Sequence, residues 1–135
     1  LQAHPAEISP EMVNHVAAMI SSLKWDEADV ADFLGQYLSE PKLDVVFNPP
    51  APISERAFTQ QLFSKGIQLD FKSQLLVSNA QFYLNGEQIV LPQSDHSILL
   101  SLADHRHLSV ADLDKASAEC IRFIYERFLA GYLMF

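Results

Sequence analysis

The chain has 135 residues, 49% of them hydrophobic, and a formal net charge of −8. This apolar content predicts a packed core and excludes a disordered chain, and the length allows one ordinary domain or two small ones. The acidic balance opposes binding to phosphate backbones, and the single cysteine excludes an internal disulfide. No apolar run reaches the roughly 18 residues of a membrane helix, and no signal peptide is visible. We therefore expect a cytoplasmic protein that does not enter a membrane.

Two amphipathic helices are predicted at the N-terminal end. Ser9 and Pro10 form a helix start, and this first helix ends near Leu23. Asp26 caps the second helix, which Pro41 ends. The apolar side chains fall on one face of each helix: Met12, Val13, Val16, Ala17, Met19, Ile20 and Leu23, then Val30, Phe33, Leu34, Tyr37 and Leu38. In the second helix, the side chains that face away are Asp29, Asp32 and Gln36.

Both helices carry more apolar surface than a two-helix segment can bury by itself. Their apolar faces could pack on the downstream residues, on a second copy of the chain, or on a domain upstream of Leu1. We favour a dimer or inter-domain contact, because wide apolar faces need a partner. The candidate interface residues are Met12, Val16, Met19, Ile20, Leu23 and Phe123.

A domain boundary is predicted around the proline-rich segment Asn48–Pro52, which follows a short extended apolar segment, Leu43–Phe47. The charge distribution changes at the same place. Residues 1–50 carry 2 Lys/Arg against 8 Asp/Glu, whereas residues 51–135 carry 7 against 9. We predict a helical dimerisation segment over residues 1–50 and a winged-helix-like domain over 53–135.

The downstream domain is predicted to begin with a helix and a small sheet. Ser54 caps the helix, Gly66 ends it, and its inward side chains are Phe58, Leu62 and Phe63. Three alternating apolar residues, Ile67, Leu69 and Phe71, predict a half-buried strand. A second strand is predicted over 75–77. A hairpin is predicted around Asn85–Gly86, because these two residues tolerate positive φ at a tight turn.

The C-terminal residues follow the element order of a winged helix. A helix over about 95–103, capped by Ser94 or Asp95, precedes a short helix over 109–114 with a capping box. A long helix over 117–130 and a strand over 132–135 complete the order. The apolar face of the long helix consists of Cys120, Ile121, Ile124, Tyr125 and Phe128. On the same helix, Phe123 lies among charged residues. The fold class is therefore α+β and mostly helical: an N-terminal helical segment, then a winged-helix-like domain with a small β-sheet or hairpin.

Two kinds of site are candidates in this domain. Asp95-His96 and Asp104-His105-Arg106-His107 bring together metal-ligand residue types, but their spacing is equally that of a helix end and its loop. A DNA-reading role for the long helix requires a basic stripe. Its cations are opposed by nearby carboxylates; the cations are Lys115, Arg122 and Arg127, and the carboxylates are Asp112, Asp114, Glu119 and Glu126. We therefore expect no metal site and no nucleic-acid partner.

Four segments together resemble one family: Ala3–Met12 (AHPAEISPEM), Asp44–Pro52 (DVVFNPPAP), Phe82–Ile89 (FYLNGEQI) and Phe128–Phe135 (FLAGYLMF). In this order and spacing they resemble the C-terminal part of bacterial ribosomal oxygenases. These are cupin/JmjC-type enzymes that depend on Fe(II) and 2-oxoglutarate and hydroxylate an arginine of a large-subunit ribosomal protein. The resemblance covers essentially the whole chain, but only the non-catalytic part of the family's architecture.

The resemblance implies a parent protein with an N-terminal cupin barrel, a helical dimerisation segment and a C-terminal winged helix. The chain would be the last two parts, which agrees with its start at Leu1 rather than Met. The family's iron ligands follow a His-x-Asp … His pattern, and no His here is followed two positions later by Asp. No catalytic, cofactor-binding or metal residue is therefore carried over. Fe(II) and 2-oxoglutarate would bind in the parent's barrel and not in this fragment, which is not expected to be an enzyme alone.

The implied partners are a second copy of the chain, as a homodimer, and the ribosomal protein substrate of the parent enzyme. The implied role is to hold the dimer and to place the substrate against the barrel. Two alternatives remain open from the residues alone. The chain could be a stand-alone winged-helix regulator that binds DNA, or a protein-interaction module that uses Phe123 and the hairpin.

Overall fold

A computed structural model describes residues 8–135, so the Ala3–Glu7 part of the N-terminal motif lies outside the described residues. Contacts divide the chain into two compact units, one ending at Val30 and the other comprising Ala31–Phe135. This division lies upstream of the one predicted between residues 50 and 53. The dimerisation role of residues 1–50 stays a prediction.

The first unit contains α1 (Pro10–Ser22), as the sequence predicts. The Oγ of Ser9 accepts a hydrogen bond from the backbone N–H of Met12 at 3.2 Å, which satisfies a donor of the first turn. Pro10 occupies the first helical position, where its missing N–H has no consequence. No residue of α1 is buried within the part of the chain that is described.

The second helix, α2 (Glu27–Ser39), also begins as predicted. Asp26 and Asp29 cap it reciprocally, because each backbone N–H donates to the other carboxylate, at 3.1 and 2.8 Å. The segment after Pro41 differs from the prediction. Leu43 and Asp44 form a turn, closed by a hydrogen bond from the N–H of Val45 to the carbonyl of Lys42 at 2.9 Å.

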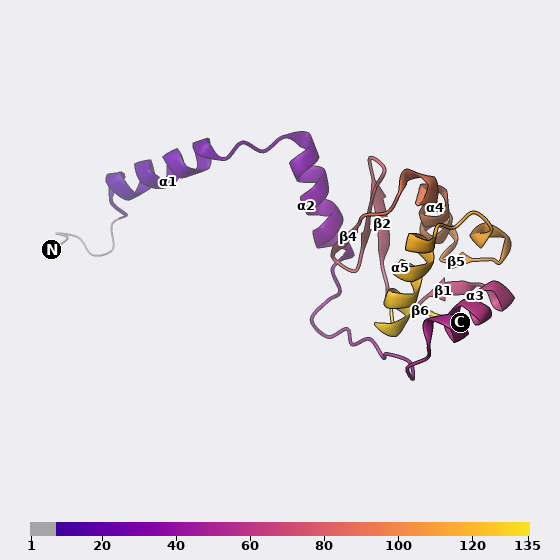
Figure 1. Cartoon of the computed structure of the whole chain (residues 1–135). Coiled ribbons are helices and arrows are strands. Elements are labelled where there is room, and N and C mark those ends of the chain that lie inside the picture. The colour runs from indigo at the N-terminus through magenta and orange to yellow at the C-terminus, as the bar shows by residue number, and fades with distance from the viewer. Residues whose placement is uncertain (1–7) are drawn as a thin grey trace. The chain divides into compact units, whose positions relative to one another are not determined.

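The winged-helix order follows this segment (Figure 1). The elements are α3 (Glu55–Lys65), β1 (Ile67–Leu69), β2 (Leu75–Ser78), β3 (Gln81–Leu84), β4 (Glu87–Ile89), η1 (Gln93–Asp95), α4 (His96–His105), β5 (His107–Leu108), η2 (Ala111–Leu113), α5 (Ala118–Leu129) and β6 (Leu133–Met134). Within residues 8–135 the strands form two antiparallel sheets, ordered β5-β1-β6 and β2-β3-β4. The second sheet is called the wing below. The predicted α+β, mostly helical winged-helix fold is confirmed.

Helices α3, α4 and α5 and the strands of both sheets supply the core. Phe58 of α3 packs in an aromatic cluster, with ring centroids 5.1 Å from Phe128 and 5.4 Å from Phe135. Fully burying a side chain of this size contributes roughly 1.5–3 kcal/mol. The other core side chains buried to 2% exposure or less include Leu62, Phe82, Leu84, Leu99, Leu102, Leu108, Leu113, Ile124 and Leu133. They come from both sheets and all three helices, so the core joins them into one unit.

Two side chains predicted to be inward are exposed. Phe63 of α3 is 39% exposed and Phe71 is 85% exposed. Strand β1 ends at Leu69, because Asp70 begins a turn in which its carboxylate accepts from the N–H of Lys72 at 2.9 Å. The alternation of the strand therefore stops before it reaches Phe71.

The start of α4 also differs from the prediction. Ser94 and Asp95 belong to the 3-10 helix η1, and Asp95 is completely buried. Its carboxylate accepts hydrogen bonds from the backbone N–H of Ser117, at 2.9 Å, and from the Ser117 hydroxyl. The Oγ of Ser117 in turn accepts from the N–H of Cys120 at 3.0 Å and caps α5. Asp95 therefore supports the start of α5 and does not cap α4.

Two turns depend on glycine. Gly66 ends α3 with φ +73°, and a Cβ there would lie 2.2 Å from the carbonyl oxygen of Leu108. Asn85 and Gly86, with φ of +51° and +89°, make the predicted hairpin turn between β3 and β4. Side chains larger than hydrogen are therefore excluded at Gly66 by contact and disfavoured at Gly86 by conformation.

Candidate functional site

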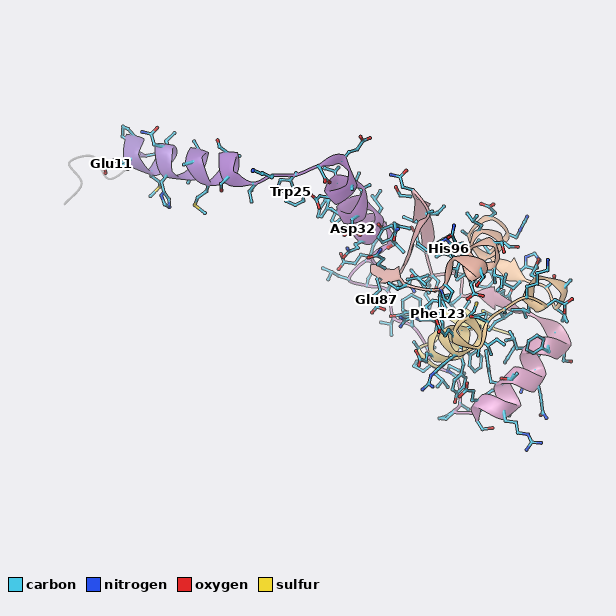
Figure 2. All side chains as sticks on the ribbon, turned by 45° about the horizontal axis from the view of Figure 1, so that its top comes forward. Glu11, Trp25, Asp32, Glu87, His96 and Phe123 are labelled. Atoms are coloured by element: carbon cyan, nitrogen blue, oxygen red, sulfur yellow. The ribbon has the colours of Figure 1, made fainter. Side chains whose placement is uncertain are left out.

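Helix α2 packs on the wing through its small and polar residues, called here the inner face of α2: Asp32, Gly35 and Ser39. The carboxylate of Asp32 accepts a hydrogen bond from the Tyr83 hydroxyl at 3.0 Å. The Oγ of Ser39 accepts from the N–H of Gly86 at 2.9 Å, at the hairpin turn. Figure 1 shows α2 beside the wing strands, and Figure 2 labels Asp32 on α2. This part of α2 therefore belongs to the winged-helix unit.

Gly35 allows the close approach. A Cβ at this position would lie 2.3 Å from the Cε2 of Tyr83, so only glycine lets the helix rest on the tyrosine ring. Tyr83 is 1% exposed. Its burial raises the pKa of the hydroxyl, and the hydrogen bond to Asp32 raises it further. The hydroxyl therefore remains a donor to Asp32 throughout the physiological pH range.

The opposite side of the same helix is apolar and uncovered. This outer face of α2 consists of Phe33, Leu34, Tyr37 and Leu38, which are 43–62% exposed. The rings of Phe33 and Tyr37 stack with their centroids 5.6 Å apart and their planes 12° apart. A helix that turns its polar side toward its own domain and its apolar side outward is the reverse of the usual arrangement. A contiguous exposed apolar surface of this kind is a candidate contact site.

The predicted interface residues of α1 are also uncovered in their own unit. Met12, Val16, Met19, Ile20 and Leu23 are 46–63% exposed, and they recur at the spacing that places them on one face of a helix. Their role in an interface stays a prediction.

Phe123, the remaining interface candidate, packs differently. It is partly buried against the core of the second unit. The guanidinium of Arg127 lies over its ring, 5.2 Å from the centroid, and the same guanidinium pairs with Glu87 of β4 at 3.1 Å. Figure 2 labels Phe123 on α5 and Glu87 on the wing. Phe123 therefore helps to join α5 to the wing, and its part in any interface stays a prediction.

The cations of the winged helix are mostly engaged within the domain. Arg122 pairs with Glu126 at 3.3 Å, and Arg106 donates to the carbonyls of Asp70 and Ser73 at 3.0 Å. Lys72 donates to the carbonyl of Val46, and the Nζ of Lys65 lies over the ring of Phe135. A DNA-binding surface needs several cations aimed at phosphates. Cations that are engaged within the domain do not favour a DNA-binding surface.

The histidine-rich loop is held by local contacts. The Nδ1 of His107 lies 3.0 Å from the carbonyl oxygen of His105, and the Oγ of Ser101 lies 3.4 Å from the Nδ1 of His105. Residues 8–135 contain no group of three or more His, Cys, Asp or Glu side chains placed to hold a metal ion. In the same residues, no helix is long and apolar enough to span a bilayer.

Cys120 is excluded as a nucleophile by its surroundings. It is completely buried in α5, and burial raises the pKa of its thiol to about 12, with a further contribution from the nearby charge of Asp95. We expect the native thiol to remain unmodified by the disulfide reagent DTNB at pH 8, whereas the chain unfolded in urea reacts completely. The absorbance of the released thiolate measures the reaction of the native chain and that of the unfolded chain. Native reaction at the rate of a free cysteine would contradict this assignment.

The sequence predicts the apolar face of α2 and favours a partner for it, but it does not say which side of the helix packs on the wing. The missed signal is the series Asp32, Gly35 and Ser39, which falls on one side of the helix. A glycine inside a helix costs about 1 kcal/mol relative to alanine, and it therefore indicates a close approach by another element.

The fold and this surface together define a winged-helix protein that carries an additional helix on its wing, with the apolar side outward. The chain belongs to the ROXA-like winged-helix family, whose model matches residues 22–134. The resemblance to the C-terminal part of ribosomal oxygenases is thus confirmed. No curated protein matches the chain.

Solved structures of the Escherichia coli protein YcfD have the same fold. One, described as a ribosomal oxygenase, has a TM-score of 0.73 and 20% identity, and the match covers 100% of this chain and 38% of YcfD. Another, in complex with cobalt and 2-oxoglutarate, has a TM-score of 0.72 and 19% identity, with 99% and 38% covered. The chain therefore spans little more than a third of the length of this relative.

Proposed function

We propose that the chain is the non-catalytic C-terminal region of an Fe(II)- and 2-oxoglutarate-dependent ribosomal protein hydroxylase of the cupin family. In this proposal it holds the parent enzyme as a homodimer and places the ribosomal protein substrate against the barrel. The family match and the description of YcfD as a ribosomal oxygenase support the class of parent protein. Since residues 8–135 contain no metal-ligand cluster, the iron and 2-oxoglutarate would bind to residues outside this chain.

The orientation of α2 is the observation that carries the dimerisation role. The wing is in contact with the inner face of α2. The outer face points the other way and therefore cannot pack on the wing of the same chain. Burial of each large apolar side chain contributes roughly 1.5–3 kcal/mol, and a second copy would bury its own face at the same time. The exposed apolar face of α1 adds surface of the same kind.

Replacing Ile20 with aspartate is expected to convert a dimeric chain into a monomer, because a carboxylate would enter an apolar interface without a partner. Sedimentation equilibrium of the 135-residue chain measures the dissociation constant. Asn14→Asp is the matched control, because it adds the same charge to the opposite face of α1, and this variant should remain dimeric. A monomeric unmodified chain at concentrations of hundreds of micromolar would refute the dimer.

A further inference from the structure

We propose that the wing of this protein is a docking surface for α2, and that Tyr83 is a positioning residue that sets the affinity of the dimer. This inference rests on the proposed dimerisation and assigns the group that controls it. The wing would then act within the chain, by presenting the outer face of α2, and not by contacting nucleic acid.

The contacts of the inner face form one continuous row. Asp32, Gly35 and Ser39 follow each other at intervals of three and four residues, the spacing of neighbours on one side of a helix. They meet the Tyr83 hydroxyl, the Tyr83 ring and the N–H of Gly86, in that order. The row fixes both the rotation of α2 about its axis and its position along the wing.

The wing side of this contact is formed by a paired strand and its turn. Tyr83 lies in the central strand β3, paired with Leu76 of β2 and with Gln88 of β4. Gly86 lies in the tight turn that joins β3 to β4. The ring of Tyr83 is 1% exposed with α2 in place, and it lies directly against Gly35. The strand pairing fixes the backbone position of Tyr83 on the wing.

The docking of α2 determines how much of the chain is ready to pair. A helix of about 13 residues is marginally stable in water without tertiary contacts. The outer face of α2 makes no stabilising contact with the wing, so the inner face must supply the stabilisation. A chain with α2 detached presents no ordered outer face. Both protomers must carry a docked α2, so the apparent dissociation constant of the homodimer is the intrinsic one divided by the square of the docked fraction, and weaker docking gives a weaker dimer.

Gly35→Ala is the sharpest test, because its two physical effects have opposite signs. Alanine favours the helix over glycine, yet its Cβ cannot coexist with the ring of Tyr83. We expect the dimer dissociation constant to rise roughly 100-fold, since each protomer carries the clash. Hydrogen exchange of the amides of residues 33–39, measured on dilute chain, should become faster.

Tyr83→Phe removes the hydroxyl and keeps the ring, and it should weaken the dimer roughly tenfold with the same change in hydrogen exchange. Asp32→Ala should act similarly. Asp32→Asn should restore the dimer, because an amide oxygen still accepts from Tyr83. Gln88→Ala is the control on the wing, because the exposed side chain of Gln88 donates to the side chain of Gln81 and makes no hydrogen bond to α2.

Thermal unfolding of each variant reports on the winged-helix core, which should be unchanged by Tyr83→Phe, Asp32→Asn and Gln88→Ala. The inference is overturned if α2 exchanges faster in Tyr83→Phe and Gly35→Ala while the dissociation constant stays the same. It is also overturned if Asp32→Asn is as weak as Asp32→Ala. A monomeric unmodified chain would instead overturn the dimerisation role, and a dimer with unaffected variants would overturn only the role of the wing.

Discussion

Replacing Asp95 with alanine is expected to lower the free energy of unfolding by about 2–4 kcal/mol. The carboxylate is completely buried and accepts hydrogen bonds from both the backbone N–H and the hydroxyl of Ser117. Alanine would leave these donors without their partner and open a cavity between η1 and the start of α5. Urea unfolding followed by circular dichroism measures the loss.

Asp112→Ala is the matched control for this prediction. Asp112 also accepts hydrogen bonds from the N–H and the hydroxyl of a serine, Ser109, but it does so at the surface of the capping box of η2. Water can replace those bonds, so the loss should be clearly smaller than for Asp95. Equal losses in the two variants would show that the buried position of Asp95 has no energetic significance.

Replacing Gly66 with alanine is expected to cost roughly 2–4 kcal/mol of unfolding free energy. The residue has φ +73°, and its Cβ would lie 2.2 Å from a backbone oxygen, that of Leu108. Because α3, β1 and β5 meet at this point, the clash can be relieved only by separating the helix end from the sheet. The same urea titration measures the effect.

Gly86→Ala separates the cost of the positive φ from the cost of the contact with the Leu108 oxygen. Gly86 has a comparable φ of +89°, but the nearest atoms to a Cβ there belong to Glu40, at 3.4 Å. This variant should lose roughly 1–2 kcal/mol, from conformation alone. If Gly66→Ala were no more destabilising than Gly86→Ala, the contact with Leu108 would be tolerated and the assignment would fail.

The elements that the sequence predicted correctly are those with local signals. Ser9, Ser54 and Ser117 each cap a helix by accepting from a backbone N–H three residues later. The Asn85–Gly86 turn is equally local. The partners in each of these interactions are only a few residues apart, so the local sequence contains every group that the interaction needs.

The features that escaped prediction depend on distant partners. Asp95 has the residue type and position of a helix cap, but its partner, Ser117, lies 22 residues further along. The apolar face of α2 is evident from periodicity, yet whether it packs inward depends on Tyr83, 51 residues from Asp32. Periodicity identifies an apolar face but not what covers it, and the exposure of this face could therefore be seen only in three dimensions.

The separation between α2 and the wing also imposes an order on assembly. The helix precedes its docking surface in the chain by 47 residues at Ser39 and Gly86. During synthesis, α2 therefore leaves the ribosome before the strands that orient it exist. Contacts between such distant residues form late, because the intervening chain must first be ordered. On the proposed dimerisation, the chain would therefore have to complete its own domain before it presents an oriented α2 to a second copy.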